Sequence, residues 1–239
     1  MRSIDAKKLE KTLVDRASRE MEMGKLAGAA MLVAQHGETV CKLHIGLSNI
    51  DTGAKLMPHA MFRLASMTKP VAGVACLIGI QNGWFGLNDL VSDYLPGIDE
   101  MRVVEFENGK PVPGHTVRNK MRIFNLLSHS SGFVAEDEFG AQQTEKIPYK
   151  YYADNRTMLD YCIKNTLLSF EPNEATAYSA YVAFDALACI IQDKSGMSYA
   201  DFLDKYLFGP LGIHDVTFRP TEEQWGRMVA MHDKLDCPR

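Results

Sequence analysis

The spacing of hydrophobic and polar positions predicts an amphipathic helix, then a pair of strands, then a mainly helical remainder. Residues 1–24 alternate charged and apolar positions at roughly helical spacing. Two largely apolar runs follow at 28–35 and 39–46, joined by the short link HGE. A Gly-containing link of this length favours an antiparallel hairpin.

Beyond this hairpin the pattern changes to helical spacing. A smaller hairpin is predicted at 103–114, around an Asn-Gly pair, and the polar and aromatic stretch at 134–157 is predicted to be a long loop. The expected helices span 67–81, 90–95, 121–128, 157–168 and 180–194, with another beginning at 198. One main hairpin followed by a helical mass is an α+β arrangement. We expect residues 1–62 to form the helix-and-hairpin part and residues 63–239 the mainly helical part.

Composition and charge argue against several classes of function. The 239-residue chain has a formal net charge of −4 and no basic run, which argues against nucleic-acid binding. No apolar stretch approaches the ~18–20 residues of a membrane span, and residues 1–24 lack the apolar core of a signal peptide. The five cysteines lie scattered at positions 41, 76, 162, 189 and 237. We therefore expect reduced core thiols in a cytoplasmic protein.

Metal and cofactor motifs are not found. The histidines have no ligand spacing, and neither the dinucleotide nor the P-loop glycine motif occurs. No metal and no cofactor are expected.

A serine and a lysine three positions apart, Ser66 and Lys69, stand at the start of an apolar helical run. Positions i and i+3 lie on one helix face, with Cβ atoms ~5–6 Å apart, so the two side chains are expected to be neighbours. Pro70 favours a helix start here, because proline is tolerated in a first turn. A nucleophilic hydroxyl needs a proton acceptor and positive potential, which the amine and the helix N-terminus can supply.

The same residues have a plainer interpretation. Ser66 or Thr68 would be an N-cap, and Lys69 a solvated residue of the first turn. Ser-x-x-Lys alone is a weak motif, although no other serine of this chain has a lysine at i+3. The residues alone leave both interpretations open.

Five segments carry a family resemblance. They are LAGAAMLVAQHGETV, FRLASMTKPVAGVACL, LNDLVSDYLPGI, RIFNLLSHSSGF and the long stretch from EPNEATAYSA to HDVTF. In this order they resemble the serine β-lactamase and penicillin-binding-protein superfamily, whose first motif is S-x-x-K. The resemblance is to its class C β-lactamase-related branch, which includes family-VIII-type esterases, transesterases and D-aminopeptidases.

The resemblance implies a β-lactamase/transpeptidase-like fold and assigns three catalytic residues. Ser66 would be the acylated nucleophile and Lys69 its proton partner. Tyr178, in YSA, would stand at the family's tyrosine position and act with Lys69 as general base. A phenol acts as a base only where a neighbouring cation favours its ionised form. Which of the two takes the first proton stays open, and without the resemblance Tyr178 would be interpreted as a half-buried aromatic at a helix start.

The chain departs from the family pattern in three places. Ala180 replaces an asparagine common in true β-lactamases, and YSAYVAFD looks more like the esterase branch. Asn173 stands where glycine is usual, a mild change because Asn tolerates positive φ. The family's K-T-G-type strand, which gives a second oxyanion donor, and the C-terminal strands after it are expected to be missing from this chain. Loss of one such donor costs about 10²–10³ in rate.

Three other signals are weaker. His129, in SHSSG, is expected to anchor its loop rather than act as a base. Lys194-Ser195-Gly196 spells K-S-G but is interpreted as a helix end, with Ser198 opening the next helix. The tyrosines at 149, 151 and 152 either line an acyl-binding pocket or pack their loop onto the helical part.

The sequence therefore predicts a serine hydrolase of esterase or transesterase type, acting on a small-molecule ester or amide through an acyl-enzyme on Ser66. The alternatives are β-lactamase or D-aminopeptidase activity, or a truncated, catalytically incomplete chain. An incomplete chain is expected to self-associate through an exposed sheet edge or to need a missing C-terminal segment.

Overall fold

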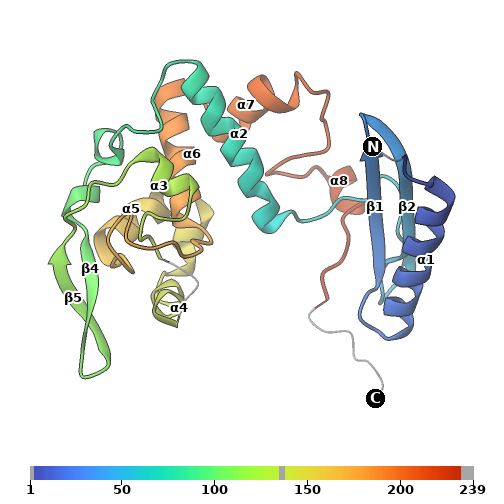
Figure 1. The fold of residues 1–239 in the computed structure, drawn as a ribbon, viewed down its shortest axis with the longest axis horizontal. Helices are drawn as coiled ribbons and strands as arrows, with labels where there is room; N and C mark the ends of the chain where they lie inside the picture. The colour runs from blue at the N-terminus through green and yellow to red at the C-terminus, as the bar shows by residue number, and fades with distance from the viewer. Residues whose placement is uncertain (1–2, 135–137, 233–239) are drawn as a thin grey trace. The chain divides into compact units, whose positions relative to one another are not determined.

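The computed structural model describes residues 3–134 and 138–232, and these residues form two compact units (Figure 1). Unit 1 combines the described residues of Met1–Leu64 and Thr217–Arg239, and unit 2 is Ala65–Val216. The division expected from the sequence placed all of 63–239 in the helical part. In the structure the described residues from Thr217 onward belong with unit 1, because the backbones of Met61 and Met228 pair as a parallel bridge.

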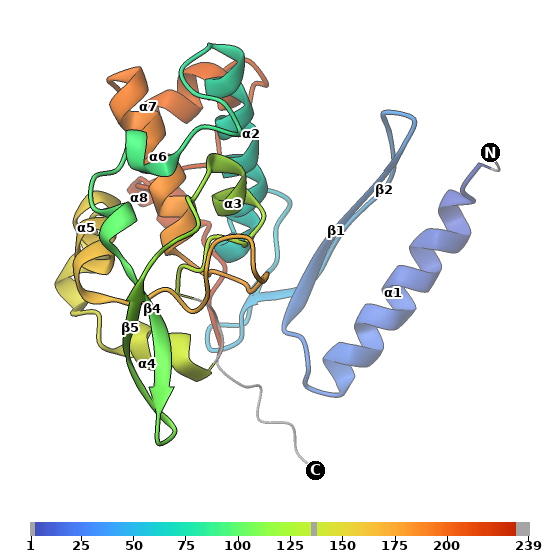
Figure 2. The same cartoon turned by 60° about the vertical axis from the view of Figure 1, so that its left-hand side comes forward.

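Unit 1 is one long helix beside a small antiparallel sheet. Its elements are α1 (Ala6–Glu22), β1 (Gly28–Gln35), β2 (Glu38–Asn49), β3 (Ala54–Lys55) and α8 (Glu222–Gly226). The strand order is β1-β2-β3, so β1 forms one edge of the sheet, and Figure 2 shows α1 lying alongside β1 and β2. The predicted hairpin is confirmed. The turn residues His36 and Gly37 both have positive φ, of 53° and 82°, which suits a tight two-residue turn.

The third strand was not predicted, because two residues are too few to produce an alternating pattern. The Cα partners of this strand are Leu47 and Asn49 on β2.

Unit 2 is a helical assembly with one projecting hairpin (Figure 2). Its regular helices and strands are α2 (Thr68–Gln81), β4 (Arg102–Glu107), β5 (Lys110–Thr116), α3 (Ile123–Leu127), α4 (Glu138–Glu145), α5 (Asn155–Asn165), α6 (Val182–Ser195) and α7 (Tyr199–Leu203). Single turns of 3₁₀ helix lie at Ala65–Met67, Val91–Asp93, Ile98–Glu100 and Tyr149–Ala153, and a π-helical turn lies at Asp204–Phe208. The predicted hairpin around Asn108 and Gly109 is confirmed.

Helix α6 is the centre of unit 2. It contacts α2, α3, α5 and α7, and Figures 1 and 2 both show it next to α2. Its buried residues are Val182, Ala183, Ala186, Leu187, Ala188, Cys189, Ile190 and Ile191. A helix that is apolar on most of its surface has to be surrounded, and the small alanines let its neighbours approach closely.

Two predicted elements differ from the structure. Residues 90–95 form only the short 3₁₀ helix Val91–Asp93, and the expected loop at 134–157 carries α4, a 3₁₀ helix and the start of α5 in its described part. The polar pattern concealed α4 because one of its buried residues is polar. Gln143 is buried, and its side-chain amide pairs with the backbone of Leu167 in both directions, at 3.0 and 2.6 Å.

The K-S-G triplet is a helix end, as predicted. Gly196 caps α6 with a φ of 67° and donates to the carbonyl of Gln192, and the Ser198 side chain caps α7.

Cys41, Cys76, Cys162 and Cys189 are buried free thiols, and Cys237 lies outside the described residues. Within those described residues, no helix has the length and apolar character needed to cross a bilayer.

Candidate active site

Ser66 lies in the 3₁₀ turn Ala65–Met67, immediately before α2. The residue before it, Ala65, has a φ of 46°, a left-handed conformation that costs a non-glycine residue about 1–2 kcal/mol and is typical of functional sites. The N-cap of α2 is Met67, and no side chain caps the helix. The plainer interpretation, in which Ser66 or Thr68 is an N-cap, therefore does not apply.

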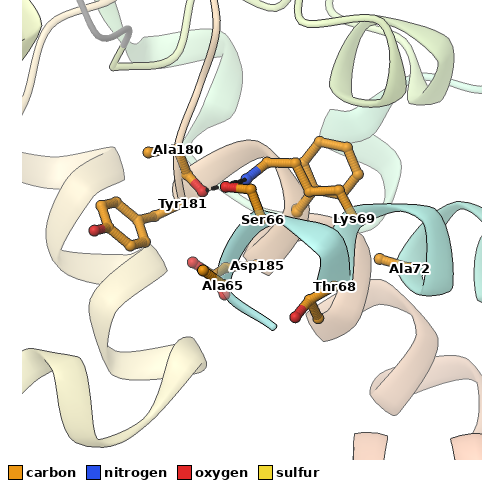
Figure 3. Close-up of a pocket in the computed structure, with 9 residues that line it drawn as sticks. Ala65, Ser66, Thr68, Lys69, Ala72, Ala180, Tyr181 and Asp185 are labelled. Atoms are coloured by element: carbon orange, nitrogen blue, oxygen red, sulfur yellow. Dashed lines mark hydrogen bonds between the residues drawn. The ribbon is translucent and has the colours of Figure 1, made fainter. Parts of the chain in front are cut away.

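Lys69 is directed at Ser66 by its neighbours (Figure 3). Its Nζ donates to the Ala180 carbonyl oxygen at 2.8 Å and to Ser66 Oγ at 3.3 Å. Nζ also lies 4.6 Å from the ring centroid of Tyr178 and 5.4 Å from that of Phe184. The ammonium is therefore held between a carbonyl and two ring faces.

Tyr178 completes the cluster. Its hydroxyl donates a hydrogen bond to Ser66 Oγ, across 112 positions of sequence. The structure thus brings together all three residues that the sequence analysis singled out: Ser66, Lys69 and Tyr178.

His129 holds the loop that carries Tyr178. Its Nδ1 accepts the backbone N–H of Ser179 at 3.1 Å, and its carbonyl accepts that of Ala177 at 3.1 Å. Its ring centroid lies 4.8 Å from that of Tyr178. Burial, with a smaller contribution from the Lys69 charge, lowers the pKa of His129, which favours the neutral ring that this acceptor role requires. His129 anchors the loop, as expected.

Further contacts stabilise the loops that carry His129 and Tyr178. The buried Asn125 side chain donates to Ser130 Oγ at 2.9 Å and to Asn173 Oδ1 at 2.8 Å. Asn173 has a φ of 71°, the positive value that its side chain tolerates. Gly132 has a φ of 78°, and a Cβ there would meet the carbonyl oxygen of Phe170 at 2.0 Å, so only glycine fits.

The cluster opens into a cavity of about 310 Å³. Its lining residues, drawn in Figure 3, are Ala65, Ser66, Thr68, Lys69, Ala72, Ala180, Tyr181, Phe184 and Asp185. Ser66 is solvent-exposed and borders this space, so a substrate carbonyl can reach its Oγ.

Asp185, in the first turn of α6, is the acidic residue of this lining. Burial raises its pKa from 3.8 to about 7, and the nearby Lys69 charge acts in the opposite direction. Its other titratable neighbours are the thiols of Cys162 and Cys189 and the phenol of Tyr199.

The arrangement suits nucleophilic chemistry. Ser66 Oγ accepts hydrogen bonds from two donors, Lys69 and Tyr178, so either group could take the serine proton once it has lost its own. The adjacent start of α2 provides backbone N–H groups and a positive dipole end for a developing oxyanion. In the part of the chain that the structure describes, no three His, Cys, Asp or Glu side chains are grouped to hold a metal ion.

Sequence reasoning missed three contributors. The Ala180 group that contacts Lys69 is a backbone carbonyl, which carries no signature in the side-chain sequence. Phe184 was assigned only to a helical pattern. Asp185 did leave a signal, since a carboxylate inside the apolar run YVAFDALACII needs a reason to be there.

Comparisons with known proteins agree on the family. The model of the Beta-lactamase family matches residues 13–238, so the chain belongs to that family. Esterase EstB of Burkholderia gladioli is 29% identical over 236 residues, covering 93% of this chain and 55% of EstB.

Two solved structures share the fold. EstCE1, described as a hydrolase with promiscuous acyltransferase activity, superposes with a TM-score of 0.79 at 21% identity, covering 99% of this chain and 61% of its own. A class C beta lactamase superposes with a TM-score of 0.69 at 19% identity, covering 96% and 56% of the two chains. The predicted α+β, β-lactamase-like fold is thereby confirmed. The chain spans about half the length of the curated relatives it matches.

Proposed function

We propose that this chain carries the nucleophile of a serine hydrolase of esterase or transesterase type, which acts on small-molecule esters or amides through an acyl-enzyme on Ser66. The observation that carries the proposal is the double hydrogen bond to Ser66 Oγ, from Lys69 Nζ and the Tyr178 hydroxyl, at the edge of a cavity. Membership of the Beta-lactamase family and the similarity to EstB support it.

In the first half-reaction, Ser66 Oγ forms a bond to the substrate carbonyl carbon while its proton passes to Lys69 or Tyr178. The tetrahedral oxyanion is stabilised by N–H groups at the start of α2. When it collapses, the bond to the leaving alcohol or amine breaks, and the stored proton passes to that leaving group. Water then releases the acid, or a second alcohol takes the acyl group.

Ester substrates fit this site better than β-lactams. Ala180 presents a methyl group and a carbonyl, and that carbonyl already accepts the Lys69 ammonium. The position therefore has no side-chain amide donor for a substrate carbonyl. The similarity to EstB, an esterase, points in the same direction.

Burst kinetics with p-nitrophenyl butyrate test the proposal. We expect a rapid release of about one p-nitrophenolate per chain, followed by slower turnover, and we expect Ser66→Ala to show no burst. A folded chain with Ser66 intact and no burst would contradict the proposal. Parallel assays with a chromogenic cephalosporin and a D-amino-acid amide test the β-lactamase and D-aminopeptidase alternatives.

The second candidate is a catalytically incomplete chain. The match to about half of each relative favours it, and so does the unpaired outer edge of β1 among the described strands. A chain of this kind would react at Ser66 but turn over slowly, because a second oxyanion donor would come from a further segment or another copy. Turnover that rises with protein concentration faster than linearly would identify such self-association.

We also propose that the protein works in the cytoplasm. Four buried free thiols support this location, since such thiols persist in reducing compartments.

A further inference from the structure

A second cavity lies against the wall of the Ser66 cavity. It has a volume of about 270 Å³, and its lining residues are Tyr152, Ala153, Asp154, Asn155, Met158, Tyr181 and Asp185. Tyr181 and Asp185 line both cavities, so the two spaces are adjacent and share these side chains as part of their walls. A substrate that extends from Ser66 past this wall would enter the second space.

The charged groups of this second cavity are all acidic. Among the described residues, its lining has the carboxylates of Asp154 and Asp185 and no Lys, Arg or His. Asp154 uses Oδ2 to cap α5 at the N–H of Thr157, and a carboxylate has a second oxygen to offer. Arg156, the nearest cation in sequence, donates instead to Asp193 at 2.7 Å and to the Cys189 carbonyl at 3.2 Å. Lys69, whose charge acts on Asp185, lines the Ser66 cavity, where it donates to the Ala180 carbonyl and to Ser66 Oγ. The lining of the second cavity therefore favours a positively charged occupant.

Two aromatic rings define the kind of cation. Tyr152 and Tyr181 meet edge to face, with ring centroids 6.2 Å apart and planes at 81°, and both side chains are partly exposed. Ring faces attract ammonium groups, because the ring quadrupole places negative charge on the face. The thioether and methylenes of the buried Met158 add an apolar surface for an alkyl chain.

We propose that this cavity, here called the amine subsite, binds the ammonium end of an aminoacyl chain while the carbonyl of that chain reacts at Ser66. The inference rests on the proposed function and names its substrate class: esters of ω-amino acids or other amine-bearing acids. Asp154 and Asp185 bind the ammonium, and Tyr152 and Tyr181 enclose it. The three tyrosines of the expected loop have different surroundings. Tyr152 lines this cavity, Tyr151 packs on Tyr161 and Tyr149 is 91% exposed.

A pair of matched esters tests the subsite. The p-nitrophenyl esters of 6-aminohexanoic and heptanoic acid differ only by an ammonium in place of a terminal methyl group. At pH 8 and low ionic strength, we expect acylation of Ser66 by the amino ester to be at least about tenfold faster, read as kcat/KM or as the pre-steady-state rate. The ratio of the two rates is the readout, which cancels effects common to both substrates.

The variants change one charge at a time. Asp154→Asn keeps an N-cap residue and should lower the ratio about three- to tenfold. Asp185→Asn should lower it as well. Asp160→Asn, on the exposed face of the same helix α5, is the matched control and should leave the ratio unchanged. A ratio near one in the unmodified chain, or a ratio unaffected by both cavity variants, would overturn the amine subsite.

A binding measurement separates this inference from the proposed function. Amide chemical shifts of the Ser66→Ala chain are followed during titration with pentylammonium chloride or with 1-pentanol. We expect the ammonium to shift residues of the subsite at lower concentration than the alcohol does, with the preference lost in Asp154→Asn. If neither ester acylates Ser66 but this preference is found, the proposed function fails and the subsite stands. If acylation occurs without either preference, only the subsite fails.

Discussion

The imidazole of His129 packs against the phenol of Tyr178 in a tilted arrangement, with ring centroids 4.8 Å apart, while its Nδ1 accepts the N–H of the next residue, Ser179. The phenol is thus located by a neighbouring loop rather than by its own helix, which begins only at Val182. Its hydroxyl reaches Ser66 Oγ from this fixed position. The arrangement of the reactive residues therefore depends on three segments: the loop that carries His129, the loop that carries Tyr178 and the start of α2.

Removing one hydroxyl tests the part played by this phenol. In Tyr178→Phe the ring can still pack against His129, but the donor to Ser66 Oγ is gone. We expect the burst rate with p-nitrophenyl butyrate to fall about 10²–10⁴-fold, the usual contribution of a positioned acid–base group. Tyr149→Phe, at a side chain that is 91% exposed, is the control. A Tyr178→Phe chain that keeps more than half of the rate would exclude the assigned role.

Asp185 makes stability depend on pH. Burial raises its pKa to about 7, so the folded state keeps a proton that an unfolded aspartate has lost above ~pH 4. Its contribution to stability is therefore full below ~pH 4, declines as the pH rises and is lost above about 7. Asp185→Asn removes this pH dependence, because the amide does not ionise.

We expect Asp185→Asn to be more stable than the unmodified chain at pH 8 by about 1–3 kcal/mol, with the difference shrinking towards pH 4. Urea unfolding followed by circular dichroism at both pH values measures it. A difference of the same size at both would show that the carboxyl is not held protonated. The exposed Asp160→Asn should show little difference at either pH.

Gly132 has a steric reason to be glycine. In Gly132→Ala, the new Cβ would lie 2.0 Å from the Phe170 carbonyl oxygen, at a φ of 78°. We expect a loss of more than about 3 kcal/mol in the free energy of unfolding, because backbone rather than a flexible side chain has to move. Gly83→Ala, with a φ of 71° and nothing within 4 Å, should lose only about 1 kcal/mol. Equal losses in the two variants would refute the steric explanation.

His115 joins two carboxylates in unit 2. Its Nδ1 lies 2.9 Å from Glu105 Oε1, and its Nε2 lies 2.9 Å from Glu171 Oε1. The hydrogen bonds to Glu105 and then Glu171 raise the pKa of His115, so its stabilising effect is full below the unfolded value of about 6.5 and is lost as the pH rises through the folded one.

His115→Gln should therefore lower the Tm more at pH 6 than at pH 9, measured by thermal unfolding. His214→Gln, an exposed histidine of the same unit, provides the comparison. A Tm loss that is larger at pH 9 would contradict the bridge.

Local patterns could be predicted from the sequence, and distant pairings could not. Ser66 and Lys69 lie three positions apart, so helix geometry alone makes them neighbours. Tyr178 lies 112 positions from Ser66, and only the family resemblance connected the two. The inward-facing Gln143 made α4 read as a loop, because the amphipathic pattern assumes that buried residues are apolar.

The return of the chain to unit 1 from Thr217 onward could not be predicted for a related reason. The segment after Thr217 belongs with unit 1 through backbone pairing of Met228 and Ala230 with Met61 and Ser48, and backbone pairing of a short segment leaves no side-chain pattern. The family match nevertheless extends over residues 13–238, so the motifs in order were sufficient for the family.

The most direct test is the reaction of the chain with an alkyl fluorophosphonate, followed by intact mass and peptide mapping. The account predicts one adduct per chain, located on Ser66, no adduct in Ser66→Ala, and an unchanged adduct in Ser195→Ala, which removes the serine of the K-S-G triplet. A folded chain that forms no adduct, or one that is labelled on a different serine, would contradict it.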